Sequence, residues 1–122
     1  MITEGIAAFV NLSETERYNG QDTGKFSIVI NMDPDEAAKV EAAGIKVKEY
    51  KNQPQRKFAS KFDVQVVDSE GDQISKNVPY GSKVRVMWEA GEPHPTYGTT
   101  AYLKKVKVLE MADNGGDDDE DF

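Results

Sequence analysis

The stretch Lys25-Phe-Ser-Ile-Val-Ile-Asn-Met32, followed at once by Asp33-Pro-Asp-Glu36, decides the fold. Its first part has apolar side chains at every second position from Phe26 to Met32, which is the period of a strand with one face in a core. Its second part offers Asp33 as a helix N-cap and Pro at the first helical position, and the Ala-rich run that follows ends at Gly44. We expect one strand and then one short helix, which is too brief to carry a core and should cap the end of a sheet.

Further segments return to a period of two. We expect strands at residues 45–50, 58–67, 82–90 and 99–111. Residues 51–57 and 91–98 are expected as loops, the second because two Pro and two Gly interrupt any strand ladder, and residues 68–72 as a turn. In the strand at 58–67 the inward side chains are expected to be Phe62, Val64 and Val66. Trp88 shares a face with Val84 and Val86, so we expect it in the core as well.

Several short strands with one helix after an early strand predict an all-β domain, and an OB-fold-like antiparallel β-barrel is the best match. The chain has 122 residues, which suits one domain over residues 1–112 and a tail over residues 113–122. Whether the first strand, around residues 6–12, belongs to the barrel or to an interface stays open.

The tail, Asp113-Asn-Gly-Gly-Asp-Asp-Asp-Glu-Asp-Phe122, holds six of the 22 acidic residues. Without it, 16 acids face 15 Lys and Arg, so a chain of net charge −7 becomes a body at −1. Consecutive acids repel and bury nothing, so we expect the tail to be disordered. A solubility tail is one interpretation. The other is an interaction tail anchored by its last residue, whose partner-binding side chains are Asp117, Asp118, Asp119, Glu120, Asp121 and Phe122.

The composition argues against an enzyme, a cofactor or a metal site. The chain has no Cys, and its single His94 lies between two prolines, so no nucleophile and base pair up. The tail lacks the alternate spacing of a calcium loop. No segment has the length of a signal peptide or membrane span, so we expect a cytoplasmic protein, in the host cytoplasm if a phage encodes it.

Basic residues cluster between residues 46 and 61, where six cations face one acid, Glu49, and alternate with aromatic rings. Single-stranded nucleic acid needs cations for its phosphates and rings for its bases. We expect a DNA-binding surface of Lys46, Lys48, Tyr50, Lys51, Arg56, Lys57, Phe58 and Lys61. The alternatives are that these lysines only face solvent and that Phe58 packs in the core. Lys83, Arg85, Lys104, Lys105 and Lys107 are candidates to extend the groove, and Tyr97 is a candidate stacking ring.

Several motifs resemble the single-stranded DNA-binding proteins of short-tailed, T-seven-like DNA phages. These motifs are Val66-Val-Asp-Ser-Glu-Gly71, Val78-Pro79, Gly81-Ser-Lys83 at the start of a Val-alternating strand, the Pro/Tyr loop after it, and Val106-Lys-Val-Leu-Glu110. The terminal Asp117-Asp-Asp-Glu-Asp-Phe122 also resembles that family's acidic end closing on Phe. The resemblance covers about residues 25–122, although this chain has a shorter tail and a more compact helix than the family.

This resemblance implies an OB fold, sequence-tolerant binding of single-stranded DNA in phage replication and recombination, strand annealing, and homodimers. It also implies that the tail contacts the DNA polymerase and the primase-helicase. Because the tail is tethered by Gly115-Gly116, we expect it to compete with DNA for the basic groove. Two alternatives from other classes are a DNA-mimic inhibitor of a host nucleic-acid enzyme, which needs carboxylates spread over its body, and a structural virion domain.

Overall fold

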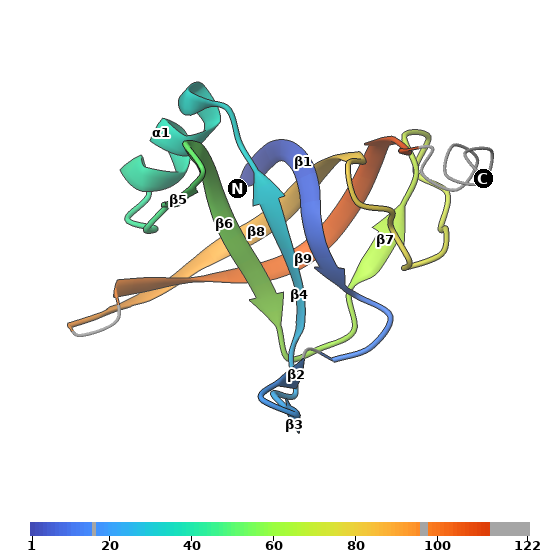
Figure 1. The fold of residues 1–122 in the computed structure, drawn as a ribbon, viewed down its shortest axis with the longest axis horizontal. Helices are drawn as coiled ribbons and strands as arrows, with labels where there is room; N and C mark the ends of the chain where they lie inside the picture. The colour runs from blue at the N-terminus through green and yellow to red at the C-terminus, as the bar shows by residue number, and fades with distance from the viewer. Residues whose placement is uncertain (16, 96–97, 113–122) are drawn as a thin grey trace.

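Nine strands and one helix make up the computed structural model, which describes residues 1–15, 17–95 and 98–112 (Figure 1). The strands are β1 (Ile2–Asn11), β2 (Arg17–Tyr18), β3 (Gln21–Asp22), β4 (Phe26–Asn31), β5 (Lys48–Tyr50), β6 (Gln53–Ser60), β7 (Gln65–Val67), β8 (Lys83–His94) and β9 (Gly98–Glu110). The helix α1 spans Pro34–Ala42. No helix in the described part of the chain is long and apolar enough to cross a membrane.

Five of the strands close into a barrel in the order β1-β4-β6-β9-β8. Strand β1 pairs antiparallel with β4 and β8, β4 pairs with β6, and β8 pairs with β9. A parallel bridge between Ala59 of β6 and Tyr102 of β9 completes the ring. This architecture is the OB fold predicted from the sequence. The first strand belongs to this barrel, which answers the question left open by the sequence.

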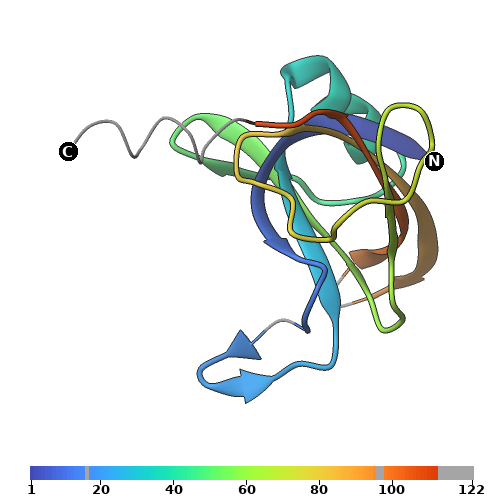
Figure 2. The ribbon, with the colours of Figure 1, turned by 90° about the vertical axis from the view of Figure 1, so that its right-hand side faces the viewer.

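The remaining short strands lie at the margins of the barrel. Strand β5 extends the sheet beside β6, and β7 extends it beside β9. Strands β2 and β3 form a separate hairpin, which the sequence did not predict and which stands away from the barrel (Figure 2).

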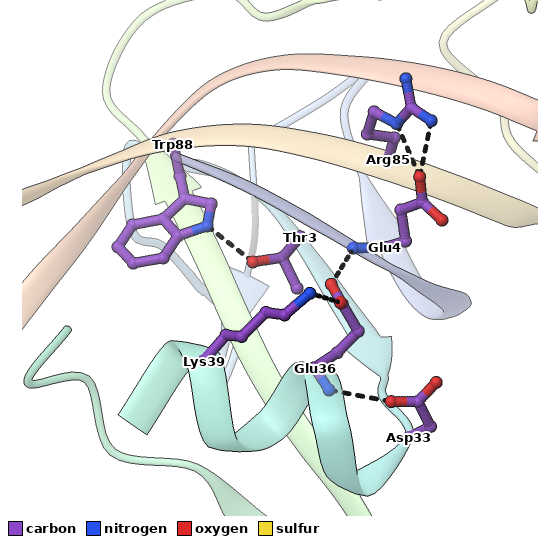
Figure 3. A network of polar contacts seen from close by, with 7 residues as sticks. All are labelled: Thr3, Glu4, Asp33, Glu36, Lys39, Arg85 and Trp88. Carbon is purple, nitrogen blue, oxygen red and sulfur yellow. Dashed lines mark hydrogen bonds and ion pairs between the residues drawn. The ribbon is translucent and has the colours of Figure 1, made fainter. Parts of the chain in front are cut away.

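The barrel interior is filled by the apolar face of each strand. Ile28 and Ile30 of β4 are completely buried, as the alternation of that strand predicted. Trp88 is buried too, with its ring 5.5 Å from that of Phe58 and its indole N–H donating to Thr3 Oγ1 at 2.9 Å (Figure 3). A buried indole needs such an acceptor, so the Trp88–Thr3 pair ties β8 to β1.

Helix α1 confirms its predicted ends. The Asp33 side chain accepts a hydrogen bond from Glu36 N at 2.8 Å, Pro34 occupies the first turn, and Gly44 follows the helix with φ 91°. The Glu36 carboxylate accepts from Glu4 N at 3.0 Å, which holds the helix against β1 (Figure 3). Ala37 and Val40 face the core, so the helix covers the end of the barrel where β4 ends and β6 begins (Figure 1).

Strand β6 differs from the prediction, because it begins within the expected loop at residues 51–57 and ends before residue 61. Lys51 and Asn52 both adopt positive φ, 53° and 68°, and so form the tight turn that joins β5 to β6. The predicted inward orientation of Phe62 is wrong, since the chain leaves the sheet there and the ring is 79% exposed. Val64 and Val66 are buried as expected.

Strand β8 is longer than predicted. It continues through residues 91–94, and β9 returns from Gly98, so the expected loop there is a two-stranded ribbon extending past β6 (Figure 1). Register shifts between Ala90 and Pro93 accommodate the proline, which a regular ladder does not tolerate.

Candidate nucleic-acid interface

A shallow depression with a polar floor and an aromatic rim lies on the outer side of β1, β4, β5 and β6. Its volume is about 320 Å³, and we call it the aromatic depression. Its lining consists of Ala8, Phe9, Asn31, Tyr50, Lys51, Gln53, Gln55 and Tyr80. Phe9, Tyr50 and Tyr80 are 64%, 58% and 64% exposed, so these aromatic side chains lie at the surface and not in the core.

Strand pairing explains why the floor is polar. Asn31 of β4 pairs with Gln55 of β6, and Tyr50 of β5 pairs with Gln53 of β6. The side chains of each pair are therefore neighbours on the outer surface of the sheet. Gln55 Nε2 donates to Asn31 Oδ1 at 2.7 Å, and Gln53 Nε2 donates to the Met32 carbonyl at 2.6 Å. These bonds orient the amides and leave donors and acceptors that suit the edges of nucleobases.

The turn between β5 and β6 adds a cation to the rim. Lys51 Nζ lies 5.3 Å from the centroid of the Tyr50 ring, within cation–π range. One side of the ring therefore carries a positive charge beside the surface on which a base can stack. A phosphate and its base would meet Lys51 and Tyr50 together.

A second depression, of about 330 Å³, lies where β6 meets β9. Three lysines and two aromatic rings contribute to it, and we call it the lysine depression: Lys25, Lys61, Lys104, Phe62 and Tyr102, with Ala59, Ser60, Thr100 and Leu103. Lys104 lies 3.8 Å from Glu89, whereas Lys25 and Lys61 form no ion pair with any other described residue.

Glycine at position 91 holds the Tyr102 ring in place. A Cβ atom at Gly91 would come within 2.5 Å of Tyr102 Cε2, a distance that atoms in contact do not reach. The ring therefore lies against the β8 backbone, and its outer face remains half exposed. This contact fixes one aromatic wall of the lysine depression.

The two depressions share one continuous face of the barrel. The row Phe9–Val29–Lys57 crosses β1, β4 and β6, and the pair Ala59–Tyr102 continues from β6 to β9. Exposed Lys57 thus lies between the depressions, and we call Lys57 together with the two linings the β4–β6 face. None of the residues lining either depression is acidic.

The structure places part of the predicted DNA-binding set on this face. Tyr50 and Lys51 line the aromatic depression, Lys61 lines the lysine depression, and Lys57 lies between them. Lys48 is exposed on β5 and pairs with Gln55, next to the aromatic depression. Lys46 is also exposed, but it precedes β5 and lines neither depression.

Phe58 and Arg56 require corrections, because both have the inward parity of β6. Phe58 is fully buried against Trp88, so the prediction that it stacks on bases is wrong for this fold. Arg56 pairs with buried Ile30, donates from Nη1 to the Lys46 carbonyl at 3.2 Å, and has a buried Nε with no partner. This burial lowers the pKa of Arg56. Arg56 supports the segment before β5 rather than the face itself.

Four other predicted cations line neither of the two depressions. Lys83 and Arg85 lie on β8, and Lys105 and Lys107 lie on β9 where it pairs with β8. In the barrel, β8 is the strand hydrogen-bonded to neither β4 nor β6, so Arg85, Lys105 and Lys107 lie on the opposite side. Lys83 pairs with Ile6 and lines a separate depression that also includes Asn31, at the edge of the aromatic depression. Lys104, by contrast, does line the lysine depression. Tyr97 and the tail side chains Asp117, Asp118, Asp119, Glu120, Asp121 and Phe122 lie outside the described residues.

Sequence reasoning missed several members of the face. Phe9 and Tyr80 were not singled out, Phe62 was placed in the core, and Tyr102 and Lys25 were not considered. Phe9 follows a β-bulge at which two consecutive residues, Ala7 and Ala8, are both buried. Strict alternation along β1 therefore does not predict whether the Phe9 side chain points inward or outward. The partial signal for Tyr80 was its position between Pro79 and Gly81, two residues that are typical of a turn outside the strands.

One group of carboxylates has the spacing of a cation site. Ligand atoms of Asp68, Glu70 and Asp72 lie within 4.8 Å of one another. Asp68 Oδ1, however, accepts from the backbone N–H of Glu70 and Asp72, at 2.9 and 3.0 Å, so the geometry of the turn accounts for the cluster. This is the turn predicted over residues 68–72.

Comparisons with known proteins agree with the fold. No protein-family model and no curated protein matches the chain. The single-stranded DNA-binding protein from bacteriophage Enc34, solved in complex with ssDNA, superposes with a TM-score of 0.68 at 13% identity, covering 93% of this chain and 87% of that one. The single-stranded DNA-binding protein gp2.5 encoded by bacteriophage T7 has a TM-score of 0.57 at 17% identity, covering 97% and 95%. At such identities the likeness establishes the shared fold.

Proposed function

We propose that this protein binds single-stranded DNA without sequence specificity through its β4–β6 face. One observation carries the proposal: the two depressions combine exposed aromatic rings with lysines, and none of their lining residues is acidic. Each base can stack on a ring whatever its identity, and each phosphate meets a lysine. The structural neighbours support the same ligand, since those proteins bind single-stranded DNA.

The face suits single strands better than a duplex. Its rings are separate and stand out from the surface, so they can contact bases only where the bases are unstacked. Its position on the second and third barrel strands is also where OB folds bind oligonucleotides. The protein is thus proposed to act in DNA replication and recombination, in the cytoplasm of an infected host, as a binding protein rather than an enzyme and as the homodimer that the resemblance implies.

The tail is proposed to compete with DNA. Its origin lies beside the face, because Ala112 N donates to Ser82 Oγ at 2.9 Å and Ala112 packs next to Gly81, which follows the rim residue Tyr80. Six carboxylates tethered there have a high effective concentration near Lys51 and Lys57. DNA that displaces them would release Phe122 to recruit the DNA polymerase and the primase-helicase.

Titration of fluorescein-labelled oligo-dT and of a duplex of the same length, at low and moderate salt, tests the proposal. We expect tight binding of the single strand, weaker binding of the duplex, and an affinity that falls as salt rises. Equal affinity for the duplex, or no binding at low salt, would contradict it.

Two tail variants test the competition. Deleting residues 113–122 should tighten binding of a short oligo-dT and flatten its salt dependence, and unchanged or weaker binding would rule the competition out. Phe122→Ala should leave the affinity for a short oligo-dT unchanged and lose the polymerase in a pull-down from infected cells. Equal polymerase retention would contradict recruitment through Phe122.

A further inference from the structure

A second basic surface lies on the side of the barrel opposite the β4–β6 face. It surrounds a depression of about 210 Å³, and we call it the β8 face: Ile2, Val67, Gly71, Arg85, Met87, Lys105 and Lys107. The function proposed above leaves these side chains without a role. They nevertheless surround exposed apolar side chains, whereas lysines that serve only to keep a protein soluble have no need of apolar neighbours.

Strand register builds the β8 face as two adjacent rows. In the first row Ile2 of β1, Met87 of β8 and Lys105 of β9 are cross-strand neighbours. In the second row Arg85 of β8 pairs with Lys107 of β9, which in turn pairs with Val67 of β7. The cations therefore rim an apolar centre.

The charge on this face is largely uncommitted. Neither Lys105 nor Lys107 forms an ion pair with another described residue. Arg85 binds Glu4 Oε2 through Nε at 2.8 Å and Nη2 at 2.6 Å, a pair that does not use its Nη1 donors. Ile2 and Met87 remain about half exposed between these cations. Such a surface fits an acidic segment that ends in a large apolar side chain.

The β8 face is a poor match for single-stranded DNA. No aromatic ring is among its lining residues, so it offers cations without a stacking platform. Since β8 pairs with neither β4 nor β6, the β8 face also stays accessible when a strand covers the opposite side of the barrel. A ligand of different chemistry can bind there at the same time as DNA.

The chain's own residues 113–122 have the required chemistry, with five consecutive acids before Phe122. Ten residues reach at most about 33–36 Å from Ala112, enough to pass from one barrel to its neighbour on the same strand. The tail leaves the body next to Tyr80, so DNA on the β4–β6 face repels it from its own molecule. The β8 face of an adjacent copy is then an attractive site.

We infer that the β8 face binds the acidic, Phe-terminated tail of a second copy of this chain, and that this contact couples neighbouring molecules on single-stranded DNA. The inference rests on the proposed function, because the tail becomes available when DNA displaces it. Phe122 packs on Ile2 and Met87, while the acids pair with Arg85, Lys105 and Lys107. The consequence is cooperative binding to long strands.

Cooperativity is measured as the ratio of the apparent affinity for a long oligo-dT, of about 100 nucleotides, to that for one of about 10 nucleotides, which one OB fold can fill. Lys105→Gln and Lys107→Gln should each lower this ratio about 1.5- to 5-fold, the effect of one partly exposed charge pair. Phe122→Ala should lower it at least as much. Lys39→Gln, which removes one charge from exposed α1, is the matched control and should leave the ratio unchanged.

The short oligonucleotide separates the two proposals. If it fails to bind, the proposed function and the inference both fall. If it binds normally and the long strand shows no cooperativity, or cooperativity that Lys105→Gln, Lys107→Gln and Phe122→Ala do not change, the inference alone is overturned.

Cysteine trapping locates the contact directly, because the natural chain contains no Cys. One pool carries Met87→Cys and the other carries Asp121→Cys with a size tag. On long oligo-dT, mild oxidation should give the mixed disulfide, and much less should form on the short oligonucleotide. Ala38→Cys on exposed α1 replaces Met87→Cys as the control. Equal cross-linking by the control would overturn the inference. The absence of a cross-link with Met87→Cys would overturn it too, and this is the result expected if each tail binds its own molecule.

Discussion

Tyr50→Ala is the substitution from which we expect the clearest loss of DNA binding. The ring is 58% exposed on the edge strand β5, and Lys51 Nζ lies 5.3 Å from its centroid. One base stacked on an aromatic ring contributes about 1–3 kcal/mol. Because the lysine occupies space beside the ring, we expect the lower part of this range, about 1–2 kcal/mol, which corresponds to an affinity about 5- to 30-fold weaker.

The assay is a titration of labelled oligo-dT, with stability checked by urea unfolding. An exposed ring contributes little to folding, so the free energy of unfolding should change by less than about 0.5 kcal/mol. Tyr50→Phe keeps the ring and should bind almost normally. Met87→Ala removes an exposed apolar side chain on the β8 face and should leave the affinity for a short oligonucleotide unchanged.

If Tyr50→Ala bound with an affinity within twofold of the natural protein while remaining folded, base stacking on Tyr50 would be excluded. An equal loss of affinity for Met87→Ala would also contradict the assignment, since the effect would then not belong to the β4–β6 face. A loss confined to Tyr50→Ala, together with its rescue by Tyr50→Phe, assigns the effect to stacking.

Three further variants test other parts of the account. Phe58→Ala should lower the free energy of unfolding by about 3–5 kcal/mol in urea denaturation, because it leaves a cavity beside Trp88; a loss under about 1 kcal/mol would contradict the core assignment. Gly91→Ala should displace the Tyr102 ring, destabilise the fold by about 1–3 kcal/mol in thermal unfolding and weaken oligo-dT binding, and unchanged values for both would show that the contact is unimportant. Lys25→Gln combined with Lys61→Gln should reduce the slope of log affinity against log salt by about 1.4, and an unchanged slope would exclude phosphate contacts there.

Local patterns were sufficient for the regular parts of the fold. The alternation through β4 predicts its buried face, and the Asp33–Pro34 start with Gly44 after the end predicts α1. Each of these features depends on neighbours a few residues away, which a sequence displays directly. The parity of Val84, Val86 and Trp88 likewise predicted the core side of β8.

The side of the barrel on which each basic or aromatic residue lies depends on how the barrel closes, which the sequence does not show. Lys57 and Lys105 look alike in sequence, but the parallel bridge between β6 and β9 and the pairing of β8 with β1 place them on opposite sides. Phe58 and Phe62 exchanged their expected environments, because the sheet ends at residue 60 and the chain turns outward. Rings on the face come from β1, β5, β9 and two irregular segments, so no single stretch of sequence shows them together.

Chemical-shift mapping of the backbone amides during titration with a short oligo-dT of about 10 nucleotides, which one OB fold can fill, is the sharpest test of DNA binding at the β4–β6 face. Shifts should be concentrated at Phe9, Asn31, Gln55 and Lys61 on the β4–β6 face, with little change at Met87 on the β8 face. Shifts centred on β8, or no shifts at saturating oligonucleotide, would contradict it.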